Sequence, residues 1–246
     1  MSKKGQITIF IIIAIVIITI GVLFFMFRDN LGIGFVNPEV SSIKTFVEEC
    51  IKGTGEDAVL FIGQSGGYFL GTASSTSEGV PYYYLNGKNY MPSKESVEKE
   101  ISLYMDSSLP YCTNEFGDFP DFNVSEGEIS TKTEIKEGEV IFSVDYPLTI
   151  TKGESSSIIK DFKMIKISAD VLPVYNAIKE IINEQVKRAG EGICLSCLYE
   201  TASENKLIVD MTPVEDGVVF VVKDEKQLIK GVGFEWRFAN KYENNE

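Results

Sequence analysis

The sequence predicts an α+β protein, with an N-terminal transmembrane helix followed by an ectodomain in which amphipathic helices cover an antiparallel meander sheet. Three observations predict this fold class. Residues 7–27 carry no charge, residues 129–171 alternate apolar and polar side chains, and several segments repeat apolar residues at helical spacing. The expected organisation follows the chain in order: a cytoplasmic segment (1–5), the transmembrane helix (6–28), a stalk (29–37), the extracytoplasmic domain (38–242, with a hypothetical subdivision near 125) and a tail (243–246).

The transmembrane helix is predicted by length and its orientation by charge. Ile7 to Phe27 are 21 uncharged residues, and a helix of that length spans about 31 Å, the thickness of a bilayer's hydrocarbon core. Lys3 and Lys4 precede it, whereas the chain after Arg28 holds 20 Lys and Arg against 36 Asp and Glu, a net charge of −16. The positive-inside bias therefore places the N-terminus in the cytoplasm and the rest of the chain outside.

The residues just before the apolar stretch suggest how the N-terminus is processed. Lys3-Lys4-Gly5-Gln6 resembles the class III signal of archaeal type IV pilin-like proteins, over about the first 27 residues. The resemblance implies that a peptidase cuts between Gly5 and Gln6 and that the apolar helix stays in the mature chain. Pilins usually carry Glu at the fifth position after the cut, where this sequence has Phe10, so the resemblance does not extend to filament assembly. An uncleaved signal anchor is the alternative.

The first part of the ectodomain is predicted to be helical. Asn37-Pro38 forms an N-cap followed by a first helical residue, and apolar residues at helical spacing predict a helix over 38–52. Gly53 and Gly55 are expected to break this helix, with a second short helix over 54–62.

A hairpin and another helix follow. Asn86-Gly87 between two Tyr-rich segments predicts a type I′ turn, since both positions of that turn need positive φ. The Tyr82–Tyr84 cluster suggests either cross-strand packing or the binding of a ligand ring. Ser93 is the predicted N-cap of a helix over 94–108.

The second half alternates strand and helix patterns. Three strands of an antiparallel meander are predicted over 129–135, 140–150 and 159–171, with Pro147 at an edge or a bulge. An amphipathic helix over 172–189, with Gln185 on its apolar stripe, is expected to cover the sheet. Strands over 207–211, 218–222 and 232–238 follow, and residues 240–246 are expected to form a frayed polar tail.

Four cysteines, Cys50, Cys112, Cys194 and Cys197, lie beyond the membrane helix, on the oxidising side. Three interpretations fit the CLSC motif of residues 194–197: a structural disulfide with Cys50–Cys112 as the second bridge, a redox-active pair, or a zinc site with all four thiolates. Structural disulfides are favoured, because the motif follows a helix and two glycines instead of a strand. The phrases FVEECI, LPYC and CLSC also resemble membrane-anchored archaeal proteins without known activity.

Composition excludes several function classes. The chain has no His, which removes Ser-His-Asp and Cys-His catalysis and HExxH zinc sites, and its net charge of −13 argues against nucleic-acid binding. No catalytic residue, cofactor or metal is predicted. Asn123-Val124-Ser125 matches the N-glycosylation pattern, and Trp236 is expected to pack in a strand.

Two functions are therefore expected as alternatives. The first is a single-pass structural or interaction protein of the cell surface, of pilin-like type. The second is a membrane-anchored thiol-disulfide oxidoreductase using Cys194 and Cys197. The expected partners are the lipid bilayer and proteins at the cell surface, and the oligomeric state is left open.

Overall fold

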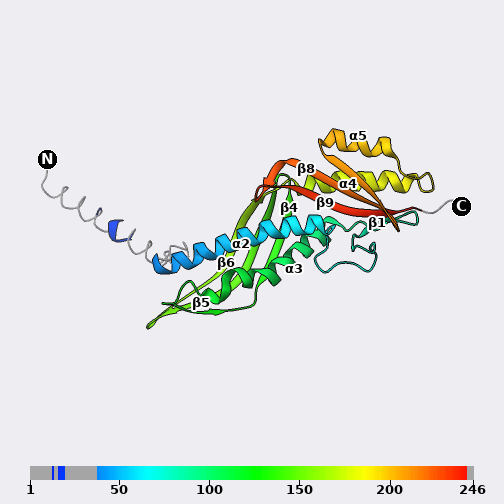
Figure 1. Ribbon diagram of the computed structural model, residues 1–246. Helices are drawn as coiled ribbons and strands as arrows, with labels where there is room; N and C mark the ends of the chain where they lie inside the picture. The colour runs from blue at the N-terminus through cyan, green and yellow to red at the C-terminus, as the bar shows by residue number, and fades with distance from the viewer. Residues whose placement is uncertain (1–12, 14–15, 20–37, 243–246) are drawn as a thin grey trace, which may run out of the picture. The chain divides into compact units, whose positions relative to one another are not determined.

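A computed structural model describes residues 13, 16–19 and 38–242 and confirms the α+β class (Figure 1). The chain divides into two compact units between Ser42 and Ile43. Among the described residues, no helix combines the length and the apolar character needed to cross a membrane. Most of the predicted transmembrane helix (6–28), the stalk (29–37), the proposed cleavage site at Gly5–Gln6 and the tail (243–246) lie outside the described residues.

Helix α2 runs without a break from Pro38 to Gln64, so the predicted division at Gly53 and Gly55 is wrong. Close packing explains why glycine stands inside this helix. A Cβ at Gly55 would lie 2.8 Å from a ring carbon of Phe142, and one at Gly63 would lie 2.3 Å from the backbone oxygen of Glu235. The missing side chains let the helix approach both sheets, and this gain outweighs the lower helix propensity of glycine.

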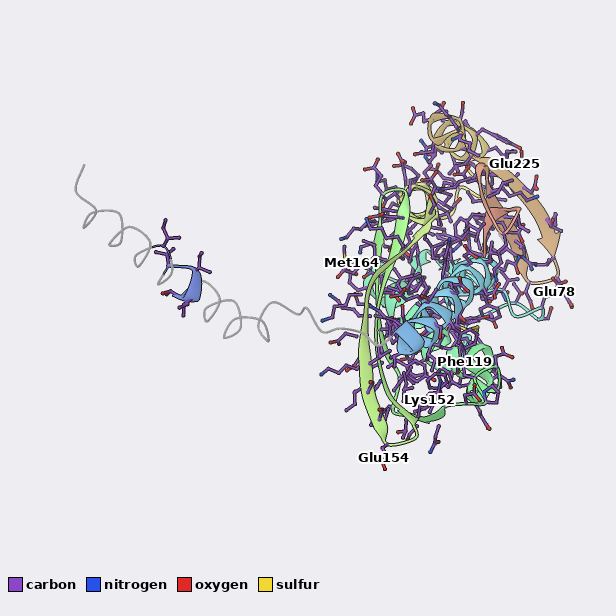
Figure 2. The ribbon with its side chains drawn as sticks, turned by 90° about the vertical axis from the view of Figure 1, so that its left-hand side faces the viewer. Glu78, Phe119, Lys152, Glu154, Met164 and Glu225 are labelled. Carbon is purple, nitrogen blue, oxygen red and sulfur yellow. A yellow bond between two sulfur atoms is a disulfide. The ribbon has the colours of Figure 1, made fainter. Side chains whose placement is uncertain are left out.

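The first sheet contains the three predicted strands and a fourth, β3, that was not predicted. It consists of β3 (Asn123–Glu126), β4 (Ser130–Lys136), β5 (Glu139–Lys152) and β6 (Ser155–Ser168), all antiparallel, with β5 between β6 on one side and β3 and β4 on the other. The third predicted strand ends at Ser168 instead of residue 171, because Val171 begins the next helix. The alternating apolar residues of β5 are buried. Pro147 lies at a register shift of β5, which confirms the predicted bulge. Figure 2 labels Glu154 at the tip of the β5–β6 hairpin and Met164 further along β6.

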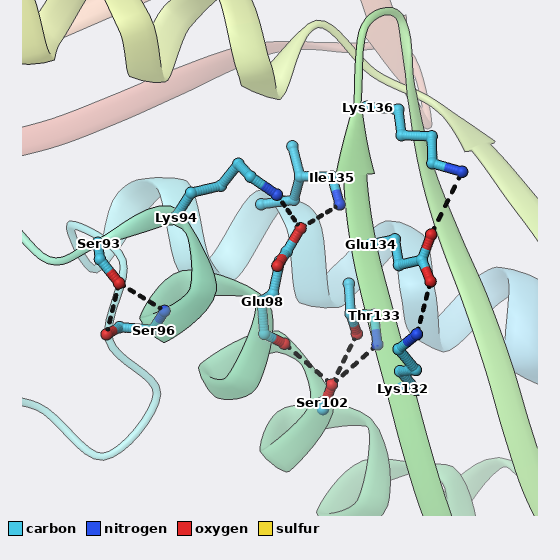
Figure 3. A network of polar contacts seen from close by, with 10 residues as sticks. All are labelled: Ser93, Lys94, Ser96, Glu98, Ser102, Lys132, Thr133, Glu134, Ile135 and Lys136. Atoms are coloured by element: carbon cyan, nitrogen blue, oxygen red, sulfur yellow. Dashed lines mark hydrogen bonds and ion pairs between the residues drawn. The ribbon is translucent and has the colours of Figure 1, made fainter.

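Helix α3 (Lys94–Thr113) covers the edge of β4 with polar side chains (Figure 3). The backbone N–H of Ile135 donates to Glu98 Oε1 at 2.8 Å, and that of Thr133 donates to Ser102 Oγ at 3.2 Å. These N–H groups lie on the side of β4 away from β5, so the helix satisfies an otherwise open edge. Ser93 is the N-cap, as predicted.

Helix α3 also extends beyond its predicted end at residue 108. Pro110 stands inside its last turns, and the left-handed Asn114 ends it. Cys112 in the last turn is bonded to Cys50 of α2, so this disulfide ties the two helices together. It joins positions 62 apart in the sequence, with a Cα–Cα distance of 5.7 Å.

The second sheet brings distant segments together in the order β2-β1-β9-β8-β7. The predicted hairpin is confirmed as β1 (Tyr82–Leu85) and β2 (Lys88–Asn89), with positive φ at Asn86 and Gly87. The last three strands are β7 (Ile208–Val214), β8 (Gly217–Ile229) and β9 (Val232–Lys241). Strand β1 pairs parallel with β9, a contact between chain segments about 155 residues apart that the sequence pattern did not predict.

Aromatic side chains fill the core beside this sheet. Phe238 stacks between Tyr83 and Phe220 at centroid distances of 5.0 and 5.1 Å. Trp236 is fully buried, and its Nε1 donates to Tyr83 Oη at 2.9 Å, which confirms strand packing for this residue. The expected frayed tail from residue 240 is wrong at its start, because β9 continues to Lys241 and Asn240 is only 1% exposed.

Candidate functional site

The CLSC motif lies at the turn between two helices that pack against each other (Figure 1). Helix α4 (Val171–Lys187) ends at Arg188, and Gly190 and Gly192 follow with φ of 86° and 79°, values that suit glycine. The chain then enters helix α5 (Leu195–Asn205), which the sequence analysis did not identify as a helix. Cys194 is its N-cap residue.

Cys194 and Cys197 form a disulfide with a Cα–Cα distance of 5.4 Å, and both residues are half-buried. The backbone N–H of Cys197 donates to Cys194 Sγ at 3.3 Å, and Ser196 Oγ lies 3.6 Å from the same sulfur. Sulfur thus takes the capping role that an oxygen usually plays. Because the N-terminus of a helix favours negative charge, this position would stabilise the thiolate of a reduced Cys194.

A small cavity of about 10 Å³ lies beneath the disulfide, enough for roughly one water molecule. Both cysteines line it together with the polar residues Glu184, Gln185 and Asn240. The remaining wall is apolar: Ile181, Ile193, Leu198 and Phe220. The disulfide therefore faces an internal space with polar groups.

A chain of hydrogen bonds fixes these polar groups. Asn240 Nδ2 donates to Tyr242 Oη at 3.2 Å, Tyr242 Oη donates to Gln185 Oε1 at 3.4 Å, and Gln185 Nε2 donates to the carbonyl of Gly192 at 2.7 Å. Burial raises the pKa of Tyr242 to about 12, against a smaller lowering by Asn240, so its hydroxyl stays protonated at neutral pH.

Asn240 has one atom without a partner. Its Oδ1 is buried and makes no hydrogen bond, although its Nδ2 is bonded to Tyr242. A buried acceptor without a hydrogen bond lowers the stability of the folded state by on the order of 1–3 kcal/mol. A hydrogen-bond donor placed next to this oxygen would therefore be favourable. Because Asn240 lines the cavity under the disulfide, a water molecule or a thiol there can supply that donor.

Two exposed apolar side chains stand on the first turns of α5. Leu195, which directly follows Cys194, is 49% exposed, and Tyr199 is 55% exposed. Their spacing of four residues places both on one face of the helix, and at 100° per residue this face is turned away from Cys197. Leu195 is therefore the exposed apolar neighbour of the disulfide in the chain, and Tyr199 extends that surface along α5.

The other predicted site residues lie elsewhere. Asn123 is exposed on β3, a position open to modification, and Tyr82–Tyr84 are buried in the core, which favours packing over ligand binding. Cys50 is 3% exposed in the middle of α2. Within residues 38–242 and the few described before them, no three His, Cys, Asp or Glu side chains come together as metal ligands, so the four-thiolate zinc interpretation does not match the two disulfides.

Three residues of this site were missed or misinterpreted from the sequence. The sequence pattern places Asn240 and Tyr242 in a polar tail and Gln185 on an apolar stripe. A glutamine within an apolar stripe was the one available signal, because a buried amide needs polar partners.

Comparison of the chain with known protein families, with curated proteins and with solved structures finds no match.

Proposed function

We propose that the chain is a single-pass membrane protein that presents residues 38–242 outside the cell as a structural or interaction module. The observation that carries the proposal is the uncharged stretch from Ile7 to Phe27. Its described apolar members, Ile13, Val16, Ile17 and Ile18, are helical and between 48% and 65% exposed. At 100° per residue they point to several sides of the helix, and an apolar surface all round a helix suits lipid.

The disulfides support an extracytoplasmic position for the domain. All four cysteines are paired, and such bonds persist in oxidising compartments. Lys3 and Lys4 before the apolar stretch favour the same orientation, with the N-terminus inside. The net charge of −16 after Arg28 keeps the domain away from an anionic lipid surface, which leaves it available to protein partners.

The pilin-like part of the proposal concerns processing. The Lys3-Lys4-Gly5-Gln6 segment supports a cut after Gly5, and the apolar helix then remains as the anchor. Mass spectrometry of the purified mature chain tests this: a start at Gln6 is expected, and a start at Met1 or Ser2 would contradict the cut while leaving the anchor intact. Recovery of dispersed monomers alone would contradict assembly into a filament.

The anchor is tested by fractionating cells that express the full chain. We expect it in the membrane fraction, released only by detergent, with the domain digested by protease added outside intact cells. Replacing Ile13 and Ile17 by Lys should shift the chain to the soluble fraction, because charges at mid-bilayer are costly. Matched Lys replacements of Ile158 and Met164, exposed apolar residues of β6, should leave it in the membrane. A soluble wild-type chain, or a domain protected from external protease, would contradict the proposal.

A further inference from the structure

We propose that Cys194 and Cys197 form a redox-active site that exchanges disulfides with a polypeptide substrate, and that Asn240 positions the proton of the second thiol. The inference goes beyond anchoring, because it assigns an activity to one end of the domain. Two independent observations carry it: the place of the disulfide at the N-terminus of α5, and the buried, unpartnered Oδ1 of Asn240, a residue that lines the same small cavity as both cysteines.

The first observation makes the reduced state accessible. On reduction, the Cys194 thiolate keeps the N–H of Cys197 as a donor and gains from the N-terminal charge of α5. A disulfide whose reduced form is stabilised in this way is more readily reduced. Cys50 differs, since it lies mid-way along α2 where backbone N–H groups are used within the helix, and its reduction would release a thiol into the core.

The second observation provides a hydrogen-bond acceptor for the thiol of Cys197. Asn240 is only 1% exposed, and its Nδ2 is held by Tyr242, so Oδ1 is the atom left to accept a hydrogen bond. The S–H of a reduced Cys197, directly or through a water molecule in the cavity, supplies the missing donor. Reduction therefore adds an S–H donor near a residue whose buried Oδ1 has no partner among the protein groups of the oxidised site.

The exchange balances in two steps. The Cys194 thiolate attacks one sulfur of the substrate disulfide, forming a Cys194–substrate bond and releasing the other substrate sulfur, which takes up a proton. Cys197 then gives up its proton and attacks Cys194 Sγ, so the Cys194–Cys197 bond forms and the second substrate sulfur leaves and is protonated. Two electrons have passed to the substrate, and a dithiol reductant restores the site. The reverse sequence oxidises a substrate dithiol.

The surface around the site indicates the substrate class. Leu195 directly follows Cys194 and exposes apolar area, which Tyr199 extends along the same face of α5. Such area favours a polypeptide with apolar side chains around its cysteines. A small hydrophilic disulfide such as oxidised glutathione would contact the sulfur atoms without using this surface.

The test uses the full chain in detergent micelles, so its outcome does not depend on membrane insertion or processing. Dithiothreitol should reduce Cys194–Cys197 while Cys50–Cys112 stays intact and the fluorescence of Trp236 stays native, as followed by alkylation and mass spectrometry. The reduced chain should then reduce a synthetic disulfide peptide flanked by Leu and Phe faster than one flanked by Ser and Glu. If the pair is reduced only under unfolding conditions, or if the dithiol reduces neither peptide, the bond is a structural staple and the proposal is wrong.

Single-cysteine variants test the order of the two steps. Cys197→Ser should trap the peptide on Cys194, and Cys194→Ser should trap about tenfold less in the same time, because only Cys194 has the stabilised thiolate. Equal trapping by the two variants would contradict the assigned roles.

The role of Asn240 is tested on each step separately. Asn240→Leu should slow the release of peptide from Cys194 about tenfold while leaving the trapping rate in the Cys197→Ser background unchanged, since only the second step involves Cys197. Asn240→Asp, which keeps an oxygen acceptor, should restore release, and Asn183→Leu on the exposed side of α4 is the control. An equal loss in both steps would show that Asn240 acts only on folding.

The apolar surface is tested by the choice of substrate. Leu195→Ser with Tyr199→Ser should remove the preference for the apolar peptide and leave the rate with oxidised glutathione unchanged. Tyr111→Ser, which alters a side chain 85% exposed on α3, should change neither rate. An unchanged preference in the double variant would contradict a polypeptide substrate bound at this surface.

Discussion

The two disulfides of this domain differ in what surrounds them. Cys50–Cys112 joins two long helices across 62 positions, with Cys50 buried in α2 and Cys112 exposed in the last turn of α3. Cys194–Cys197 joins positions three apart at a helix start, and both of its residues are half-buried above a small cavity that Asn240 also lines. One bond therefore ties two long helices together through a buried sulfur, whereas the other closes a short loop at the N-terminus of a helix.

Removal of each bond should give the largest difference between the two. Cys50→Ser with Cys112→Ser should lower the free energy of unfolding by about 4 kcal/mol, because the bond restricts a long loop in the unfolded chain. Cys194→Ser with Cys197→Ser should lower it by about 2 kcal/mol, since the loop is only a few residues long. Guanidinium unfolding of the full chain in micelles, followed by Trp236 fluorescence, measures both.

If the two double variants lose the same free energy of unfolding, loop length does not determine how much each disulfide stabilises the domain. Single variants are the control: Cys112→Ser leaves a free thiol at Cys50 in the core and should not be less stable than the double variant by more than about 1 kcal/mol.

Glycine contacts hold α2 in place independently of its disulfide, and they give the next largest effect. Gly63→Ala would place a Cβ 2.3 Å from the carbonyl oxygen of Glu235 and should destabilise the protein by about 1–3 kcal/mol, because helix and strand must move apart. Gly53→Ala meets nothing within 4 Å and should stabilise it by about 0.5–1 kcal/mol through helix propensity. If both changes stabilise the chain, α2 is held by the disulfide instead of by close backbone contact.

Local sequence signals predicted the elements well where neighbours in the chain decide the structure. The three predicted strands that became β4, β5 and β6, the Asn86-Gly87 turn and the Ser93 cap are confirmed, since each depends on a few adjacent residues. Only the end of the third strand is wrong, because residues 169–171 leave β6 and begin α4. The amphipathic stripe of α4 is confirmed for the same reason.

Contacts between distant segments were the part that sequence could not supply. Gly55 remains helical because Phe142, 87 positions later, lies against it, and β1 forms a parallel pair with β9. Asn240 begins a polar segment that is typical of a chain terminus. It becomes part of the site because β9 extends to Lys241 and places Asn240 in the interior. Local patterns in a single sequence contain no information about contacts between distant segments. The CLSC motif could therefore be recognised from the sequence, whereas the cavity beneath it and the side chain of Asn240 could not.

Helix α3, which carries Cys112, is also held by polar contacts with β4. These contacts show how much of its stability does not depend on the Cys50–Cys112 bond. Ser102→Ala removes the acceptor for Thr133 N–H and should cost about 1 kcal/mol, with faster hydrogen exchange at that amide. Glu98→Ala should act in the same way at Ile135. Lys132→Ala, which breaks a surface ion pair with Glu134, should change stability by less than about 0.5 kcal/mol. Equal changes in stability for all three variants would mean that the hydrogen bonds from α3 to the edge of β4 contribute no more than a surface ion pair.

A further small effect is expected at the start of α4, the helix that leads to the CLSC motif. Asp170 is the residue before α4, and its pKa is raised, first by burial and then by the nearby carboxylate of Asp224, against an opposing effect of Lys226. Asp224 is 3% exposed and accepts a hydrogen bond from the backbone N–H of Lys226, so its position is fixed. The ionised Asp170 is therefore disfavoured in the folded state.

The sign of the pH dependence follows from this direction. A raised pKa means that the folded chain binds the proton of Asp170 more tightly, so its contribution to stability is present below the usual pKa of Asp and is lost as pH rises through the folded value. Asp170→Asn should remove this slope and raise stability at neutral pH by less than about 1 kcal/mol, because the group is only partly buried and solvent screens its charge. Unfolding midpoints measured across the acid range, against Asp118→Asn as an exposed control, test it. If the dependence of stability on pH is the same in Asp170→Asn as in the wild type, repulsion between Asp170 and Asp224 does not destabilise the folded state.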